Sequence, residues 1–388
     1  MTSIFHGLSI TENADTTPSL NTVSTQTIGI VATGDDADNG VFPLDTPVLF
    51  TDLETALGKA GKTGTLFKAL SAINANVSAP VIVVRVADNQ DADALNASVI
   101  GMVDENGNRK GLQALLSAEN ITGLKPKIIA APALDTQPVT TAMIPILKTL
   151  RAFGYARAIG ETVADAIKYR ANFDARELML LWPDVLAFNS ATGATEIFPA
   201  SAFAVALRAA IDESTGFQKT LSNVAISGIT GLAKSVTFDL MSMSTDAGLL
   251  NQSGITALIR NNGFKFWGNR TTASDPNYAF ETATRTGQVL IDTIANGLDW
   301  AMDQPLIPSL VTTITEEINN ELRLLVSQGK LIGGKCWFDT DKNTAANLAA
   351  GKLYISYNFT PVAPLENLSI TQTITDSYYA DFSASSSS

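Results

Sequence analysis

The sequence predicts a mixed α/β and α+β protein: an α/β domain, then a C-terminal α+β domain, with an extended arm at each end. From residue 48 to about residue 217, short apolar runs alternate with helical stretches, which is typical of helices packed on a buried sheet. After a polar, glycine-containing stretch at residues 221–254, longer helices and half-exposed strands follow. The N-terminus mixes a short apolar patch with a polar run, and the C-terminal tail contains an alternating segment that has no obvious neighbour in sequence.

The predicted strands of the first domain are short apolar runs at Val81–Val86, residues 127–131 and Leu178–Trp182. The second and third end at Pro132 and Pro183, and proline ends a central strand because it lacks an N–H group. Amphipathic segments between the strands predict helices over residues 53–73, 111–118, 139–153 and 162–173.

Two helices and two strands are predicted in the C-terminal domain. One long helix covers residues 276–302, with Phe280, Val289, Ile294 and Leu298 on its apolar side and Asn277, Glu281, Asn296 and Asp299 on its polar side. A second covers residues 309–327, with one stripe formed by Leu310, Ile314, Ile318, Leu322 and Leu325. Residues 334–339 and 352–359 predict strands, the second with alternating apolar side chains.

Each terminus combines a short apolar pattern with polar residues. Residues 1–20 contain Phe5, Leu8 and Ile10, and in the tail segment LSITQTIT the residues Leu368, Ile370 and Ile374 alternate with polar ones. Ordering such a tail costs about 1–2 kcal/mol per residue, whereas each hydrogen bond returns only about 0.5–1.5 kcal/mol. We therefore expect the tail to be ordered as an added strand in a sheet, which could belong to another subunit. The final SASSSS is predicted to be disordered.

Composition excludes several classes of partner. The 388 residues carry 26 Lys and Arg against 38 Asp and Glu, a net charge of −12, which opposes direct contact with nucleic acid or anionic lipid. No apolar run is long enough to span a membrane. Only 16% of residues are charged, which suits a surface largely covered by copies or partners. The single cysteine and the N-terminus without a signal pattern predict synthesis in a reducing cytoplasm.

The motifs that suggest chemistry are incomplete. ALGKAGKT at residues 56–63 ends like a phosphate-binding loop, but Ala56 replaces the first glycine and a helix precedes the loop, so we favour a helix end and a turn. DDADNG at residues 35–40 and DTDKNT at residues 339–344 imitate calcium loops but lack required positions. Both are interpreted as solvated turns.

The titratable residues point to no catalytic site, so none is predicted. His6 is the only histidine and lies near the N-terminus, which leaves no histidine for a rigid triad or metal cluster. Cys336 is interpreted as a packed thiol. Glu316 and Glu317 are expected on a solvated helix face. An enzyme that uses only carboxylates stays open at this point, but nothing singles out a pair.

The stretch GFKFWGNRT at residues 263–271 is dense in aromatic and basic side chains. Such a pattern can stack nucleic-acid bases, but the chain is acidic and the surrounding sequence supplies no basic patch. We favour a structural corner in which Trp267 and one of the two phenylalanines, Phe264 or Phe266, anchor a core and Arg270 covers a ring or bonds exposed carbonyls. Gly263 and Gly268 permit tight turns there.

The same stretch carries a family resemblance. GFKFWGNRT, preceded by LLNQSGITALIRNN at residues 249–262, resembles contractile tail sheath proteins. The similarity extends to KTLSNVAISGITG (219–231), LRAFGYARAIG (150–160), YRANFDARELMLLWPD (169–184) and GKLYISYNFTPVAPLENLSITQTITDSYY (351–379). The chain most resembles the sheaths of P2-like myophages and, more distantly, R-type pyocin sheaths.

This resemblance implies a structural subunit of a bacteriophage contractile tail, with no cofactor, that forms stacked hexameric rings around an inner tube. Contraction would drive the tube through the target cell envelope. The implied division is an N-terminal arm (1–20), an outer α/β domain (21–262), an inner tube-facing domain (263–361), and a C-terminal arm with a disordered end (362–388). The arms would add strands to neighbouring subunits through the side chains Phe5, Leu8, Ile10, Leu368, Ile370 and Ile374.

Further expectations concern partners and location. The implied partners are copies of the chain, the inner tail tube protein, and baseplate and tail terminator proteins, with Arg323 and Lys330 as candidate tube contacts. Phe264, Phe266, Trp267 and Arg270 would anchor the junction between the domains. The subunit is expected in a virion tail or a bacteriocin-like particle, assembled in the bacterial cytoplasm. The alternatives are a carboxylate-based hydrolase or nucleotide-binding enzyme on the α/β domain, or a static tube or capsid protein.

Overall fold

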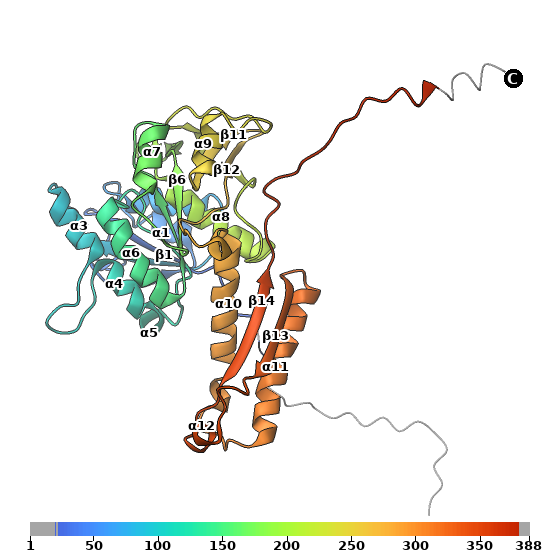
Figure 1. The fold of residues 1–388 in the computed structure, drawn as a ribbon. Coiled ribbons are helices and arrows are strands. Elements are labelled where there is room, and N and C mark those ends of the chain that lie inside the picture. The colour runs from blue at the N-terminus through green and yellow to red at the C-terminus, as the bar shows by residue number, and fades with distance from the viewer. Residues whose placement is uncertain (1–19, 21, 380–388) are drawn as a thin grey trace, which may run out of the picture.

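The computed structural model describes residue 20 and residues 22–379, so the predictions on Phe5, Leu8 and Ile10 lie outside the described residues. The chain folds into two parts (Figure 1). The first is a large sheet with helices packed on it, and the second is an elongated arrangement of two helices and a two-stranded sheet. The C-terminal segment leaves the second part and extends away from the body (Figure 1).

A nine-stranded sheet forms the centre of the first part, in the order β2-β3-β1-β4-β5-β6-β11-β12-β9. The six strands from β3 to β11 are parallel, β2 is antiparallel to β3, and β12 is antiparallel to both β11 and β9. The strands are β1 (Ile28–Thr33), β2 (Val48–Phe50), β3 (Val81–Val86), β4 (Ile128–Ala130), β5 (Phe153–Arg157), β6 (Leu178–Trp182), β9 (Ala225–Ile226), β11 (Ile255–Arg260) and β12 (Phe264–Trp267). The predicted strands at 81–86 and 178–182 are confirmed, and the one at 127–131 is slightly shorter than predicted.

Helices cover both faces of this sheet, which explains why its strands are continuously apolar. Successive residues of a strand point to opposite faces, so Ile28 and Ile30 of β1 join one core while Val31 joins the other. The first core lies under α1 (Leu53–Leu57), α2 (Leu66–Asn74) and α8 (Ala200–Ser214). The second lies under α3 (Ala92–Ile100), α4 (Gly111–Ala114), the 3₁₀ turn η1 (Leu115–Ser117), α5 (Ala118–Thr122), α6 (Gln137–Leu150), α7 (Val163–Arg170) and α9 (Asp246–Gln252).

Several predicted helices differ from the observed ones. The prediction of one helix over residues 53–73 is wrong, because Gly61 and Gly64 both take a φ of +74° in a loop that separates α1 from α2. The predicted helix over 111–118 is two short helices joined by a 3₁₀ turn. No helix was predicted for α8, which is buried nearly all round and therefore lacks an amphipathic pattern.

A second, three-stranded antiparallel sheet has the order β10-β7-β8. Its strands are β7 (Val185–Asn189), β8 (Ala194–Phe198) and β10 (Ile229–Leu232). Val185 and Phe198 face the core beneath α8, whereas Phe188 and Ile197 are exposed, so this small sheet has one apolar face in the interior and one in solvent.

The second part of the chain contains α10 (Glu281–Gly297), α11 (Pro308–Ser327), β13 (Leu331–Phe338), α12 (Ala345–Ala349) and β14 (Ile355–Pro361). The strands β13 and β14 form an antiparallel pair that packs on α11. The predicted stripe of α11 is confirmed, because Ile314, Ile318, Leu322 and Leu325 are buried and Leu310 is partly buried. This core is separate from the two cores of the large sheet.

The prediction of a single helix over residues 276–302 is wrong at both ends. A 3₁₀ turn, η2 (Pro276–Tyr278), precedes α10 and another, η3 (Asp299–Ala301), follows it. The break before α10 lies at Phe280, whose extended backbone (φ −98°, ψ 140°) is not helical. Two charge placements also differ from expectation: Glu281 is completely buried, and Glu317 is buried while Glu316 stays exposed.

Candidate functional site

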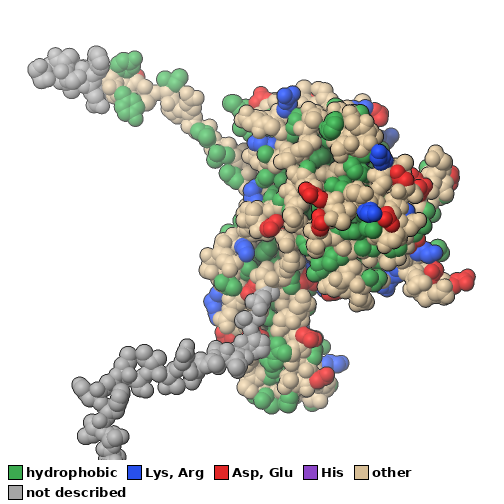
Figure 2. Space-filling model, turned by 180° about the vertical axis from the view of Figure 1, so that it is seen from behind, with side chains coloured by type: hydrophobic (Ala, Val, Ile, Leu, Met, Phe, Trp, Pro, Cys, Tyr) green, Lys and Arg blue, Asp and Glu red, His purple; other side chains and the backbone are tan. Residues whose placement is uncertain are grey.

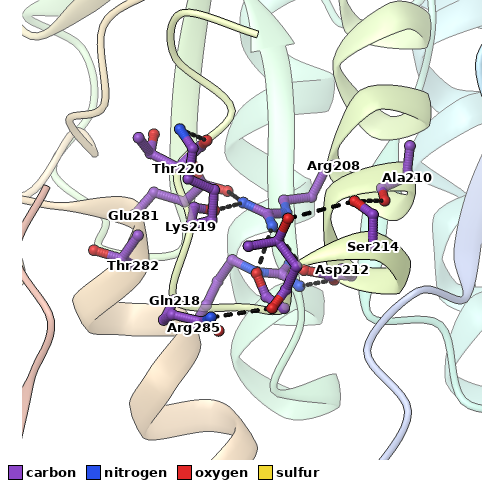
Figure 3. Close-up of polar contacts among 12 residues, drawn as sticks. Arg208, Ala210, Asp212, Ser214, Gln218, Lys219, Thr220, Glu281, Thr282 and Arg285 are labelled. Carbon is purple, nitrogen blue, oxygen red and sulfur yellow. Dashed lines mark hydrogen bonds and ion pairs between the residues drawn. The ribbon is translucent and has the colours of Figure 1, made fainter. Parts of the chain in front are cut away.

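The two parts of the chain meet at a buried cluster of charged side chains (Figure 3). Arg208 and Asp212 lie one turn apart on α8, and Glu281 and Arg285 lie one turn apart on the first turns of α10. Arg208 Nη2 lies 2.8 Å from an Asp212 oxygen, and its Nη1 lies 3.2 Å from Glu281 Oε1. Arg285 pairs with the other oxygen of Asp212, and the Tyr155 hydroxyl of β5 donates to Glu281. The cluster therefore connects the large sheet, α8 and α10.

Backbone carbonyls complete the surroundings of Arg208. Its Nη1 donates to the carbonyl of Lys219 at 2.6 Å and its Nη2 to that of Gly216 at 3.3 Å. Two arginines face two carboxylates, so the charges balance within the interior. Burial and the neighbouring Glu281 carboxylate raise the pKa of Tyr155 well above its ordinary value, which keeps its hydroxyl proton available as a donor.

A second group of contacts lies further along α10. Asp292 pairs with Lys127, which precedes β4, and with Arg151, which follows α6. Gln288 donates to the carbonyl of Ala152 at 2.8 Å. Desolvation lowers the pKa of Lys127 despite its partner Asp292. One side of α10 is thus attached to the sheet at several points along the helix.

The sequence alone could not identify this junction. Arg208 and Glu281 are 73 residues apart, and no motif relates them. The local signal is the Arg208 and Asp212 spacing of four on a mostly apolar helix, which places an ion pair where few charges are expected. The sequence pattern places Glu281 on the polar side of its helix, because nothing in the sequence marks it as a buried residue.

The C-terminal arm begins beside the start of α10. The Thr282 hydroxyl donates to the carbonyl of Val362 at 3.2 Å. Four residues later the Glu366 carboxylate accepts two hydrogen bonds from Arg270, from Nε at 2.8 Å and from Nη2 at 2.6 Å. The Arg270 guanidinium also lies over the Phe280 ring, 5.3 Å from its centroid. Arg270 thus covers a ring, as predicted, and also holds the arm.

Beyond Glu366 the arm is an extended segment with exposed apolar side chains, as the space-filling view shows (Figure 2). Leu368 is 68% exposed, Ile370 82% and Ile374 94%. Residues 362–379 form no strand within the subunit, although their sequence alternates as a strand does. Apolar side chains exposed to this extent on an extended segment indicate a surface that a partner covers.

The aromatic residues of the stretch at 263–271 lie in β12. Phe266 is fully buried in the core of the large sheet, and Trp267 packs edge-on against Phe238 with ring centroids 5.0 Å apart. Gly263 and Gly268, which flank the strand, have φ values of +103° and +140°. These aromatic residues therefore belong to the large sheet, although the predicted inner domain begins at residue 263. Its role as an anchor of the domain junction stays a prediction.

The two candidate tube contacts, Arg323 and Lys330, have different surroundings. Arg323 is exposed on α11, 3.3 Å from Glu316. Lys330 follows the helix and is half-buried, with its ammonium 6.0 Å from the centroid of the Phe217 ring. Neither placement tests whether these side chains touch a tube, so both stay predictions.

The loop that imitates a phosphate-binding site is occupied by the chain itself. The Asp36 carboxylate accepts hydrogen bonds from the backbone N–H groups of Lys62 (2.8 Å) and Thr63 (3.0 Å), and from the Thr63 hydroxyl. The Thr63 hydroxyl and these backbone donors lower the pKa of Asp36 to about 2. Since a carboxylate takes the donors that a phosphate would need, the geometry agrees with a helix end and a turn.

The remaining candidate sites show no arrangement for chemistry. Asp339 is engaged by Lys342 and by the Ser356 hydroxyl at 2.7 Å. In the described part of the chain, no three His, Cys, Asp or Glu side chains are grouped to hold a metal ion. Cys336 is a buried thiol whose pKa burial raises to about 11, as expected for a packed cysteine. Among residues 20 and 22–379, no helix has the length and apolarity to cross a membrane.

Comparison with known proteins decides the family. Three family profiles match: the phage tail sheath protein central domain over residues 107–272, the phage tail sheath C-terminal domain over residues 273–375, and the N-terminal region of tail sheath protein Gp18 domain III over residues 25–86. The tail sheath protein of Escherichia phage P2 is 46% identical over 389 residues, covering 98% of each chain. The chain belongs to the phage tail sheath family. The major tail sheath protein of Serratia phage KSP20 is 47% identical, with 97% of each chain covered.

Solved sheath structures share the fold of this sheath subunit. The contracted helical sheath of the anti-feeding prophage matches with a TM-score of 0.72 at 19% identity, covering 95% of this chain and 98% of that one. The contracted sheath complex of the extracellular contractile injection system PVC matches with a TM-score of 0.71 at 18% identity, covering 97% and 99%. The mixed α/β fold predicted from the sequence is confirmed.

Family membership settles the class of function. The chain is a contractile tail sheath subunit, a structural component of a phage tail. Its relatives are structural proteins, so the alternatives of a hydrolase, a nucleotide-binding enzyme and a static tube or capsid protein are set aside. The solved structures that share this fold include a baseplate and contracted sheath assemblies.

Proposed function

We propose that this sheath subunit forms stacked hexameric rings around an inner tail tube and that its terminal arms add strands to sheets of neighbouring copies. The observation that carries the proposal is the C-terminal arm, whose alternating apolar side chains Leu368, Ile370 and Ile374 are more than two-thirds exposed. An extended segment of this kind supplies backbone hydrogen bonds and one apolar face to an open sheet edge.

The proposed acceptor is the pair β13 and β14. Within the described residues, each of these strands pairs only with the other, so each has a free edge. A two-stranded sheet is only marginally stable by itself, and further strands increase its stability. Trp337 on β13 and Tyr354 next to β14 are each 38% exposed, which leaves apolar surface for an added strand to cover. Another copy of the chain would supply that strand.

In this proposal, contraction changes how the subunits are arranged in the sheath, while the arms keep their contacts with neighbouring copies. The sheath assembles in an extended, metastable form, and the baseplate releases it. Each subunit then buries additional apolar surface against its neighbours. At about 25 cal/mol per Å², about 200 Å² of further apolar burial supplies about 5 kcal/mol per subunit, and every subunit adds to the total. Contraction would drive the tube through the target cell envelope without a nucleotide.

The remaining parts of the proposal concern partners and place of assembly. The inner tail tube protein would contact the second part of the chain, with Arg323 and Lys330 as candidate residues. Baseplate and tail terminator proteins would bind the two ends of the polymer. Neither nucleic acid nor a membrane would bind the subunit directly, in line with its net charge of −12. Assembly would take place in the bacterial cytoplasm.

Truncation tests the arm exchange. A variant lacking residues 362–388 is expected to stay folded, because the arm contributes little to the subunit's own cores, but to form no sheaths in negative-stain micrographs. A variant lacking only residues 380–388 is the matched control and is expected to form normal sheaths. Striated cylinders of normal length from the longer truncation would overturn the proposal.

A further inference from the structure

Two short motifs that are far apart in the sequence meet at the base of the C-terminal arm. Arg270 belongs to WGNRT and Glu366 to PLENL, 96 residues apart, and they form a two-pronged ion pair. A guanidinium that donates two parallel hydrogen bonds to one carboxylate fixes the relative orientation of both groups.

Arg270 is held on a rigid base. On either side of it, Thr271 N–H donates to the carbonyl of Ala279 at 2.8 Å, and Glu281 N–H donates to that of Asn269 at 3.0 Å. The side chain is further constrained by the Phe280 ring beneath its guanidinium. The orientation of Arg270 is thus set by the start of α10, and so by the helix that the buried charge cluster attaches to the large sheet.

The arm is held at two points before it becomes free. The Thr282 hydroxyl binds the carbonyl of Val362, and Arg270 binds the side chain of Glu366. The first contact fixes a backbone position and the second fixes the direction of a side chain. Together they set the direction of the segment and its rotation about its own axis.

Rotation matters because side chains alternate along an extended segment. Glu366 has the same parity as Leu368, Ile370 and Ile374, so all four lie on one face when the segment is a strand. Turning the strand over, or shifting it by one residue, would present the face with Asn367, Ser369 and Thr371 instead.

We propose that Arg270 is a positioning residue that aims the C-terminal arm, so that the face with Leu368, Ile370 and Ile374 is presented to a second copy of the chain. This inference rests on the proposed strand addition and extends it by naming the face and the contact that sets it. Both partners are about 40% exposed, at 44% for Arg270 and 39% for Glu366. A pair of this exposure raises the population of the arm conformation held by Arg270 by up to about fivefold. This is enough to favour one direction of the arm, while loss of the pair would leave the subunit folded.

A spin label at the base of the arm tests the contact in the subunit itself. Asn367→Cys gives an exposed thiol next to Glu366, while the native Cys336 is buried and unreactive. Arg270→Glu and Glu366→Arg are each expected to increase the mobility of the label, and the double variant with exchanged charges to restore it. Lys59→Glu, which breaks another exposed pair, is the matched control and should leave the label unchanged. Unchanged mobility in Arg270→Glu would overturn the proposal.

Sheath assembly of the same variants gives the second readout. Each single charge reversal is expected to reduce the number and length of sheaths in micrographs, and the exchanged pair to recover them. If residues 362–388 are required for sheaths but the reversals have no effect, the positioning role is wrong and strand addition stands. If the truncation forms normal sheaths, strand addition is wrong, and the label still decides whether Arg270 holds the arm.

Discussion

Replacing Arg208 by methionine tests whether the buried charge cluster holds the two parts of the subunit together. Arg208 has no exposed surface, and its loss removes the arginine partner of Glu281. Among the described residues, that buried carboxylate then keeps only the hydrogen bond from the Tyr155 hydroxyl. Asp212 keeps Arg285. Breaking a buried ion pair by removing one partner costs about 3–5 kcal/mol, a large share of the about 5–15 kcal/mol that stabilises a typical domain.

Urea denaturation of dissociated subunits, followed by tryptophan fluorescence, measures this loss in the free energy of unfolding. The four tryptophans report on both parts: Trp182 and Trp267 lie in or beside the large sheet, and Trp300 and Trp337 lie in the second part. A decrease of about 3–5 kcal/mol is expected.

A double-mutant cycle separates the pair from its surroundings. Arg208→Met and Glu281→Gln together should cost less than the sum of the two single changes, with a coupling energy of about 1–3 kcal/mol. Arg323→Met, which removes an arginine from an exposed pair, is the control and should cost less than about 1 kcal/mol. A loss below about 1 kcal/mol for Arg208→Met, or simple additivity, would refute the reasoning.

Three further predictions concern the tube, a glycine and an acid. Reversing the charge of both Arg323 and Lys330 should weaken co-assembly of sheath with tube while leaving the subunit folded, and unchanged co-sedimentation would remove them as contacts. Gly64→Ala should lower the melting temperature more than Gly107→Ala, because both have positive φ but an added Cβ at Gly64 would lie 2.4 Å from a backbone oxygen, whereas Gly107 faces open space. Asp36→Asn should destabilise the subunit at pH 6. Folding lowers the pKa of Asp36 from 3.8 to about 2, so its contribution to stability is present above pH about 4 and is lost as the pH falls toward 2. The difference in denaturant midpoint between wild type and variant should therefore be smaller at about pH 3 than at about pH 6. An equal difference at both pH values would contradict this prediction.

Much of the sheet and the C-terminal helices could be predicted from sequence because their signals are local. Val81–Val86 and Leu178–Trp182 are apolar runs bounded by polar residues or proline, and the stripe of α11 repeats every three to four residues. The helix α8 escaped prediction because it is buried nearly all round and so has no polar side. The break before α10 depends on the extended backbone of Phe280, which its local sequence did not indicate.

For the candidate sites, too, local patterns could be predicted from the sequence, whereas contacts between distant residues could not. The sequence identified Leu368, Ile370 and Ile374 as an apolar strand face without a neighbour, since alternation is readable from the chain alone. It also singled out Arg270, but not its partner Glu366. The contact forms because β14 ends close to the start of α10, next to Arg270. No sequence pattern indicates that these two points of the chain lie close together.

What the sequence determined by itself was therefore the composition, the local periodicities and the family markers, which together indicate a structural, polymer-forming protein with extended ends. Only the tertiary structure decided which charges are buried and which partners they have. Glu281 has the sequence context of a surface residue, yet it is fully buried because Arg208 and Tyr155, distant along the chain, lie beside it. A carboxylate can be buried only where distant residues supply opposite charge and hydrogen bonds, and their arrival at one point is a property of the whole fold.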